Sequence, residues 1–148
     1  MKGLVLSLAL LVTSGCATTP STHGQSQWIQ PVQAVQLAAA AAPDGVPGVF
    51  ALQVQGTGTQ DGFTYLNSEI DYRDQRSLTI AITSSAARQL ETKLGAPAIV
   101  ALKGKRILVD GIATRAKIDF TTDGRPTGKY YYQTHVRVTD PEQIQLQQ

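Results

Sequence analysis

The amino-acid sequence predicts a mainly β domain that follows an N-terminal signal and a tether. Three observations lead to this fold class. From Gly48 onward, apolar and polar residues alternate in several short segments, as in strands that bury one face. Turn-forming glycine, proline and aspartate residues separate these segments. A segment with helical periodicity, residues 84–95, stands between the third and the fourth predicted strand.

The first 15 residues have the three parts of a secretory signal peptide. Lys2 supplies a positive charge, residues 3–12 form an apolar segment, and residues 13–15 are small. A transmembrane helix needs roughly 20 apolar residues, so this segment is too short to be one. We therefore expect residues 1–15 to be removed and the mature chain to begin at Cys16.

Cys16 is the only cysteine of the chain, and it directly follows the predicted signal. The string Val12-Thr13-Ser14-Gly15-Cys16 resembles the lipobox of bacterial lipoproteins, although that family prefers Leu where this chain has Thr13. The resemblance implies that Cys16 carries diacylglycerol and palmitate chains, which anchor the protein in a membrane at about 0.8 kcal/mol per buried methylene. Ala17, in place of Asp, implies the periplasmic face of the outer membrane. The alternative is an ordinary secretory signal followed by an unrelated cysteine.

Residues 16–47 are predicted to hold the lipidated cysteine, a flexible tether and a short helix. Residues 17–33 have no Lys, Arg, Asp or Glu and are rich in Thr, Ser and Gln, as flexible linkers are. Within them, Trp28-Ile29 either docks on the domain or lies at the membrane interface, where tryptophan is favoured. Residues 32–42 favour a helix with apolar positions 32, 35, 38 and 39 on one face. Pro43-Asp44-Gly45 ends this helix.

The domain itself is predicted to span residues 48–148 and to open with a hairpin. In residues 48–55, Phe50, Leu52 and Val54 alternate with Ala51, Gln53 and Gln55, which indicates a half-buried strand. The glycine-rich segment 56–62 connects it to a second strand, Phe63–Ser68. Residues 48–68 are therefore expected to pair with each other.

A third strand and a helix follow a charged connection. Residues 77–83 place Leu78, Ile80 and Ile82 on one face of a strand. Ser84 is the predicted N-cap of the helix, and Gly95 the predicted C-cap. After Pro97, the apolar residues Ile99, Val100 and Leu102 are expected to help cover the core.

Two further strands complete the domain. Residues 105–113 form the fourth strand and residues 130–138 the fifth, with Tyr130 and Tyr132 on the same side as Val136 and therefore in the core. Asp140-Pro141 makes a turn, and residues 144–146 end the chain as a short strand.

The order strand, strand, strand, helix, strand, strand is that of the OB-fold, a five-stranded Greek-key barrel. Three strings strengthen the resemblance to a bacterial group of small OB-fold proteins: residues 65–73, with Tyr-Leu-Asn-Ser and Asp-Tyr-Arg; residues 104–111 in the fourth strand; and residues 136–144, with an Asp-Pro-x-Gln-Ile turn. The expected fold is thus an OB-fold barrel with a helix between strands three and four and a short N-terminal helix. The group implies no common activity, and the fold alone does not supply one.

The connection between the last two strands is the candidate ligand site. Residues 114–129 form a longer excursion than a hairpin needs, with Asp123-Gly124 at its expected tip. OB-folds use the loop between their last two strands to hold ligands. The predicted ligand-binding residues are cationic or aromatic and lie in this loop or on the adjoining strand face: Arg115, Lys117, Arg125, Lys129, Tyr131, His135 and Arg137.

These features favour a lipid-anchored envelope adaptor that recognises a protein or an envelope polymer such as a glycan. Its partners would be the membrane, through the lipid, and this ligand. The first alternative is binding of single-stranded nucleic acid or another polyanion by the cations and aromatic rings. The anchored location makes this alternative less favoured, because it separates the protein from cytosolic DNA and RNA. The second is a structural envelope lipoprotein without a dedicated ligand.

Several function classes lack their sequence signals. The mature chain has 12 basic residues, after the loss of Lys2 from 13, against 11 acidic ones, so no strong net charge attracts polyanions. One cysteine allows neither an internal disulfide nor a cysteine zinc cluster. No catalytic or cofactor motif is present, and we expect neither enzymatic activity nor a cofactor or metal. The acidic residues of segment 69–76, interleaved with Arg73 and Arg76, favour a salt-bridged loop over a calcium site.

Overall fold

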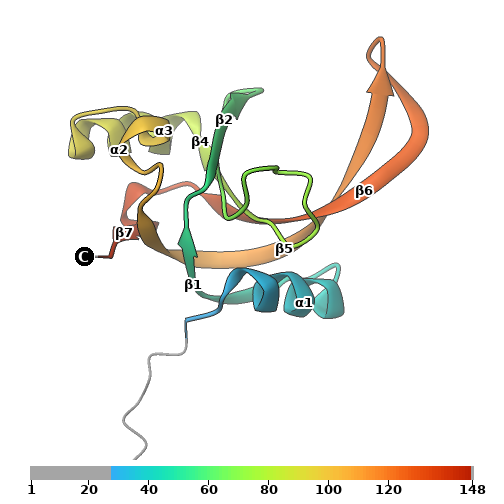
Figure 1. The fold of residues 1–148 in the computed structure, drawn as a ribbon, viewed down its shortest axis with the longest axis horizontal. Coiled ribbons are helices and arrows are strands. Elements are labelled where there is room, and N and C mark those ends of the chain that lie inside the picture. The colour runs from blue at the N-terminus through green and yellow to red at the C-terminus, as the bar shows by residue number, and fades with distance from the viewer. Residues whose placement is uncertain (1–27, 148) are drawn as a thin grey trace, which may run out of the picture.

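One sheet of seven strands dominates the computed structural model, which describes residues 28–147 (Figure 1). The strand order is β1-β5-β6-β4-β3-β2, and β7 pairs with β5. Among the strand pairs of the described residues, β4–β6 alone is parallel. The strands are β1 (Val46–Gln53), β2 (Gly56–Gln60), β3 (Phe63–Asn67), β4 (Leu78–Thr83), β5 (Arg106–Thr122), β6 (Arg125–Val138) and β7 (Ile144–Leu146). The predicted mainly β class is confirmed, whereas the sheet is not closed into the predicted five-stranded barrel.

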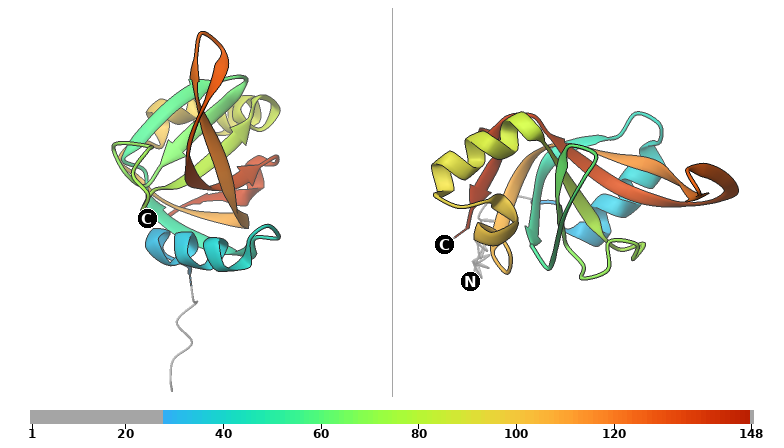
Figure 2. Two further views of the ribbon diagram at one scale, coloured as in Figure 1. Left: turned by 90° about the vertical axis from the view of Figure 1, so that its right-hand side faces the viewer. Right: turned by 90° about the horizontal axis from the view of Figure 1, so that it is seen from above.

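The two edge strands of the sheet, β1 and β2, are consecutive in the chain and separated by Val54 and Gln55. The Val54 N–H donates to the Lys105 carbonyl at 2.9 Å, on the β5 side, and the Gln55 N–H donates to the Asn67 carbonyl at 2.8 Å, on the β3 side. The chain therefore passes from one edge of the sheet to the other within two residues. This brings the edges close together, and the sheet is strongly curved (Figure 2).

The predicted hairpin over residues 48–68 is partly wrong. β1 pairs with β5, and the hairpin is formed by β2 and β3. The glycine-rich segment that was expected to be a connection is itself strand β2, and the turn is Asp61-Gly62, with φ of 51° and 79°. Glycine is needed at position 56 because a Cβ there would lie 2.7 Å from the Glu69 carbonyl oxygen. Gly56 thus allows the close approach of the segment that follows β3.

Helix α2 (Ser84–Leu94) connects β4 to the short helix α3 (Ala98–Ala101). Its N-cap is Thr83, whose hydroxyl accepts a hydrogen bond from the Ala86 N–H, and not Ser84 as predicted. The Ser84 hydroxyl instead donates to the Gly62 carbonyl of the β2–β3 turn. The predicted C-cap, Gly95, is confirmed by its left-handed φ of 73°. The helix between the third and the fourth predicted strand is therefore present.

Helix α1 (Pro31–Ala41) confirms the predicted short N-terminal helix, but a different face is buried. Ala34 and Ala38 are fully buried against the sheet, whereas Val32 is 47% exposed. Hydrogen bonds of Ile29 to β1 fix the chain just before the helix and so determine which side of the helix faces the sheet. The Ile29 N–H donates to the Val49 carbonyl, and the Ile29 carbonyl accepts from the Ala51 N–H. Ile29 thus docks on β1 just before the helix begins, and Trp28 beside it stays exposed.

The core is built from side chains that alternate along the strands, as the period of two predicts. Leu102 is buried as expected, while Val100 is 66% exposed because the one-turn helix α3 packs with only one side. No helix among residues 28–147 is long and apolar enough to cross a membrane. The largest fully buried side chains are Phe50, Val54, Leu66, Leu78, Ile80, Ile82, Leu102, Ile107, Val109, Val136 and Val138.

Candidate binding surface

Strands β5 and β6 extend past the rest of the sheet as a two-stranded ribbon, which we define as residues 114–133. β1 pairs with β5 only as far as Ala113, and β4 pairs with β6 only from Thr134 onward. In this range β5 and β6 therefore pair only with each other. The ribbon projects from the body of the domain and ends in a tight turn (Figure 1).

Asp123 and Gly124 form the tip of this ribbon, as the sequence predicts. Both have positive φ, 51° and 73°, which is the backbone that two-residue hairpin turns require and that Asp-Gly supplies. Residues 114–129, expected to be a loop, are thus paired strand on both sides of the tip. A register shift between Asp119 and Thr121 marks a bulge near the tip. The long excursion is an ordered arm.

The inner face of the ribbon continues the face that buries Ala113 and Val136. Arg115 and Lys117 lie here on β5, opposite Thr134 and Tyr132 on β6. The Arg115 guanidinium is 3.7 Å from the centre of the Tyr132 ring, and the Lys117 ammonium is 4.7 Å from that of Tyr130. Such contacts between a cation and an aromatic face are favourable by about 0.5–1 kcal/mol at exposed sites. Cations and rings therefore form one layer along this face.

The prediction that Tyr130 and Tyr132 belong to the core is wrong. Their side chains are 52% and 38% exposed. They do share a face with Val136, but within residues 28–147 neither β1 nor β4 extends beside the ribbon where they occur. The two rings pack edge to face at 5.6 Å instead.

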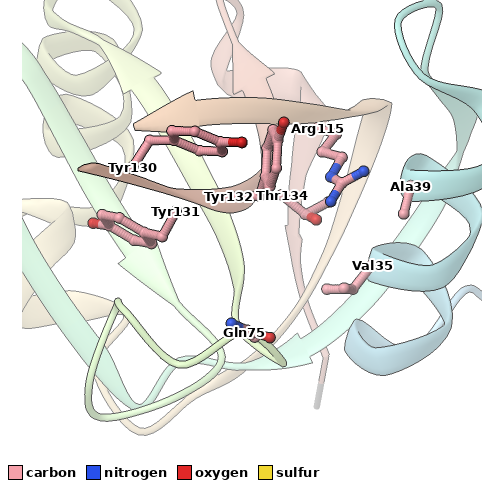
Figure 3. Close-up of a pocket in the computed structure, with 8 residues that line it drawn as sticks. All are labelled: Val35, Ala39, Gln75, Arg115, Tyr130, Tyr131, Tyr132 and Thr134. Carbon is pink, nitrogen blue, oxygen red and sulfur yellow. The ribbon is translucent and has the colours of Figure 1, made fainter. Parts of the chain in front are cut away.

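A cleft of about 280 Å³ lies between this inner face and helix α1 (Figure 3). Figure 3 shows the Arg115 side chain between the Tyr132 ring and helix α1. No carboxylate pairs with Arg115 among residues 28–147, whereas Lys117 forms an ion pair with Asp119 at 2.9 Å, which raises the pKa of Lys117. Arg115 is thus available to an anionic group. The lining residues are Val35, Ala39, Gln75, Arg115, Tyr130, Tyr131, Tyr132 and Thr134.

The outer face of the ribbon joins the outer face of the sheet in a band of aromatic rings. Phe120 and Tyr131 lie 5.1 Å apart on the ribbon. On the sheet, the Tyr65 ring is 6.4 Å from His135 and 6.1 Å from Phe63. These rings offer stacking partners to a planar or apolar ligand.

Arg137 supplies the positive charge of this band, with its guanidinium 5.2 Å from the centre of the Phe63 ring. Sequence reasoning missed Phe63 and Tyr65 as site residues. Their alternation with the buried Leu66 was the available signal, because it places them on the face opposite the core.

Hydrogen bonds hold the polar side chains of the outer face in place. The Gln133 amide nitrogen donates to the Tyr131 hydroxyl at 2.8 Å, and its amide oxygen lies 2.6 Å from His135 Nε2. Because an amide oxygen only accepts, His135 Nε2 carries the proton. Burial lowers the pKa of His135 and raises the pKa of Tyr131. Both groups are therefore neutral near pH 7 and act here by hydrogen bonding, not charge.

The acidic segment before β4 forms the salt-bridged loop that was predicted. Arg73 Nε lies 3.0 Å from Asp71, and Arg76 binds Asp74 through two nitrogens at 3.1 and 2.7 Å. The hydrogen bond from the Arg76 side chain lowers the pKa of Asp74 to about 2. No group of three or more His, Cys, Asp or Glu residues within 28–147 is arranged to hold a metal ion. Asp71 and Asp74 are therefore the ion-pair partners of the neighbouring arginines.

The predicted ligand-binding residues do not converge on one site. Arg115 and Lys117 lie on the inner face, whereas Tyr131, His135 and Arg137 alternate onto the outer face. Tyr131 also lines the cleft. Arg125 and Lys129 flank the exposed tip. Cys16 lies outside the described residues.

No family model matches the chain, and no curated protein matches it. Among solved structures, it is similar to an aspartyl tRNA synthetase from Entamoeba histolytica, at 12% identity and a TM-score of 0.43, over 99% of this chain and 28% of that one. It is also similar to a "putative aspartyl-tRNA synthetase" from Leishmania major Friedlin, at 13% identity and a TM-score of 0.40, over 87% of this chain and 22% of that one. The chain thus spans about a quarter of the length of these proteins, and likeness at this level assigns no function.

Proposed function

We propose that the protein is a lipid-anchored binding protein of the bacterial cell envelope, which recognises a protein or an envelope polymer through the ribbon and the adjoining sheet face. The observation that carries this proposal is the pair of exposed tyrosine rings on the inner face of the ribbon, Tyr130 and Tyr132. Tyr130 and Tyr132 contribute nothing to the core, yet they are large and rigid and are stacked with cations. Tyrosine and arginine are the residue types that dominate the energetics of binding surfaces.

We infer that the sheet is a variant of the five-stranded OB barrel. In this interpretation β1 and β2 are two halves of one bent first strand, which occupies both edges of the sheet. β3, β4, β5 and β6 are then strands two to five, and the parallel β4–β6 pair joins strands three and five. The ribbon takes the place of the loop between strands four and five, which is a ligand-binding loop in that fold.

We infer further that Cys16 carries the lipid and holds the protein on the periplasmic face of the outer membrane. Replacing Cys16 by Ser removes the acylated thiol, so the protein should move from the membrane fraction to the soluble fraction of fractionated cells. Ala17→Asp tests the sorting step, since it should shift the protein to the inner membrane. A Cys16→Ser protein that stays with the membrane would refute the anchor.

Cross-linking in intact envelopes tests the binding surface. The Arg115/Lys117/Arg125→Ala variant removes three positive charges from the ribbon, and the Lys103/Lys105/Arg106→Ala variant removes three exposed charges elsewhere on the chain. The ribbon variant should lose cross-linked partners that the wild type and the control variant keep. Identical partner lists for all three proteins would refute the ribbon as the binding surface and favour a structural envelope protein.

A second candidate function is binding of single-stranded nucleic acid or another polyanion by the outer face. The specific support is the row of Phe63, Tyr65 and His135 rings with Arg137 beside them, because stacking rings and cations together bind such strands. A filter-binding titration of the detergent-solubilised full chain with an oligonucleotide tests it. Binding should weaken steeply with salt and be lost in Tyr65/Arg137→Ala. No retention at low salt would exclude this function.

A further inference from the structure

Helix α1 buries only two alanines against the sheet and leaves two of its larger apolar residues exposed. The inward positions are Ala34 and Ala38, both fully buried. Val32 and Leu37 flank the outward side, about 140° apart around the helix, and are 47% and 37% exposed. Trp28, just before the helix, is 39% exposed. A surface helix in water has the reverse arrangement, with its large apolar residues inside. The outward side of α1 is therefore suited to contact with something other than water.

No charged residue lies on this side of the helix. We define the α1 outer face as Trp28, Val32, Gln33, Gln36, Leu37 and Ala40, all of which are exposed. Asp44 is the only Lys, Arg, Asp or Glu between residues 17 and 60. Charged side chains resist transfer to an apolar environment far more than amides do. This surface can therefore lie against the boundary between lipid headgroups and acyl chains without burying a charge.

The α1 outer face lies close in sequence to the predicted lipid anchor, and this position indicates what the face contacts. Only eleven residues, 17–27, separate Cys16 from Trp28. Even fully extended, a chain of that length reaches no more than about 40 Å. A lipid on Cys16 would thus keep α1 near the bilayer, and a short tether converts weak binding into an intramolecular contact at high effective concentration.

We propose that the α1 outer face rests on the membrane surface in which Cys16 is anchored, with Trp28 in the interfacial layer; this inference depends on the lipid anchor proposed above. Tryptophan concentrates in that layer, and helices with an apolar face lie in its plane. In Figures 1 and 2, α1 lies on one side of the domain and the tip of the ribbon points toward the opposite side. The contact therefore directs the ribbon away from the bilayer, toward its ligand.

Trp28 is the only tryptophan of the chain, so its fluorescence reports on this surface alone. The full lipoprotein is reconstituted into phosphatidylethanolamine–phosphatidylglycerol vesicles, with and without bromine on the acyl chains. Trp28 emission should shift to shorter wavelength on reconstitution and should be quenched by the brominated lipid. In the Val32→Asp/Leu37→Asp variant the protein should still float with the vesicles, but Trp28 should emit as it does in water and escape quenching.

Val100→Asp is the matched control, because Val100 is an exposed valine on a different helix, α3. Its Trp28 emission should equal that of the wild type. Circular dichroism of all three proteins checks that the substitutions leave the fold intact. A wild type that floats with unquenched Trp28 would overturn the membrane contact while leaving the anchor standing. A wild type that does not float would refute the anchor and, with it, the contact.

Discussion

The charge state of His135 follows from its position on the outer face. The ring packs beside Tyr65 and lies 2.6 Å from the Gln133 amide oxygen. Burial lowers its pKa below the ordinary value of 6.5. The folded protein therefore favours the neutral ring, while the unfolded chain takes up a proton at a higher pH than the folded chain does.

This difference predicts a pH dependence of stability. The contribution of His135 to the free energy of unfolding is fully present above pH 6.5. It is lost as the pH falls from there through the folded-state pKa, because the unfolded state then binds more protons. Urea unfolding of the wild type and of His135→Gln, measured at several pH values, should show this loss only in the wild type.

The effect of His135 on stability can be separated from that of the carboxylates in the loop before β4, because the two act in different pH ranges. Their arginine partners lower the pKa values of Asp71 and Asp74 from 3.8, so their effects on stability are confined to more acidic solutions. Between pH 6.5 and pH 3.8, the difference between wild type and His135→Gln therefore reports the histidine. Parallel stability curves for the two proteins would contradict the assigned burial.

At the scale of elements, the packing of β1, β5 and β6 depends on a glycine. Gly111 of β5 lies opposite Gly48 of β1, and a Cβ at position 111 would be 2.7 Å from Val136 Cγ1. Val136 is fully buried and β-branched, so it has little freedom to move aside. The absence of a side chain at 111 is what lets the neighbouring strand approach.

Gly111→Ala should therefore destabilise the fold by about 1–3 kcal/mol, as overpacking of a filled core does. Gly58→Ala is the control, because a Cβ at that strand position meets no atom within 4 Å. It should change the free energy of unfolding by no more than about 0.5 kcal/mol. Equal effects of the two substitutions in urea unfolding would contradict the packing described for β5 and β6.

The whole molecule divides into a packed body and a projecting arm. None of the buried residues lies between 114 and 133, although buried residues stand directly before and after this range, at Ala113 and Thr134. The ribbon is thus connected to the core without being part of it. Substitutions in such an arm can therefore alter binding with little effect on the stability of the body.

Excision of the ribbon tests this division. Replacing residues 117–132 by Asn-Gly joins Ala116 to Gln133, which already face each other across the two strands, through a tight hairpin turn. The free energy of unfolding should change by less than about 1 kcal/mol, because no core contact is removed. Envelope cross-links should disappear. A loss of cooperative unfolding would mean that the ribbon helps to hold the body together.

Much of the fold could be predicted from local sequence. The alternation of Leu78, Ile80 and Ile82 identifies strand β4, and the periodicity of residues 84–95, ended by Gly95, identifies helix α2. Asp123-Gly124 locates the tip of the ribbon. The composition of the first 16 residues predicts a signal and a lipidated cysteine, which lie outside the described residues. These features depend on a few neighbouring residues, so a short window of sequence contains the information.

The partners of each strand could not be predicted in the same way. Periodicity shows which side of Tyr130 and Tyr132 faces inward, but whether anything covers that side depends on where β1 and β4 stop pairing with β5 and β6. The same holds for β1, whose partner is β5 and not the adjacent β2–β3 hairpin. The sequence by itself determined the mainly β class, the positions of most strands and the tip of the arm, because these are local properties of the chain. Only the tertiary structure decided which aromatic rings are exposed and which cations share a face, because both depend on contacts between segments far apart in the sequence.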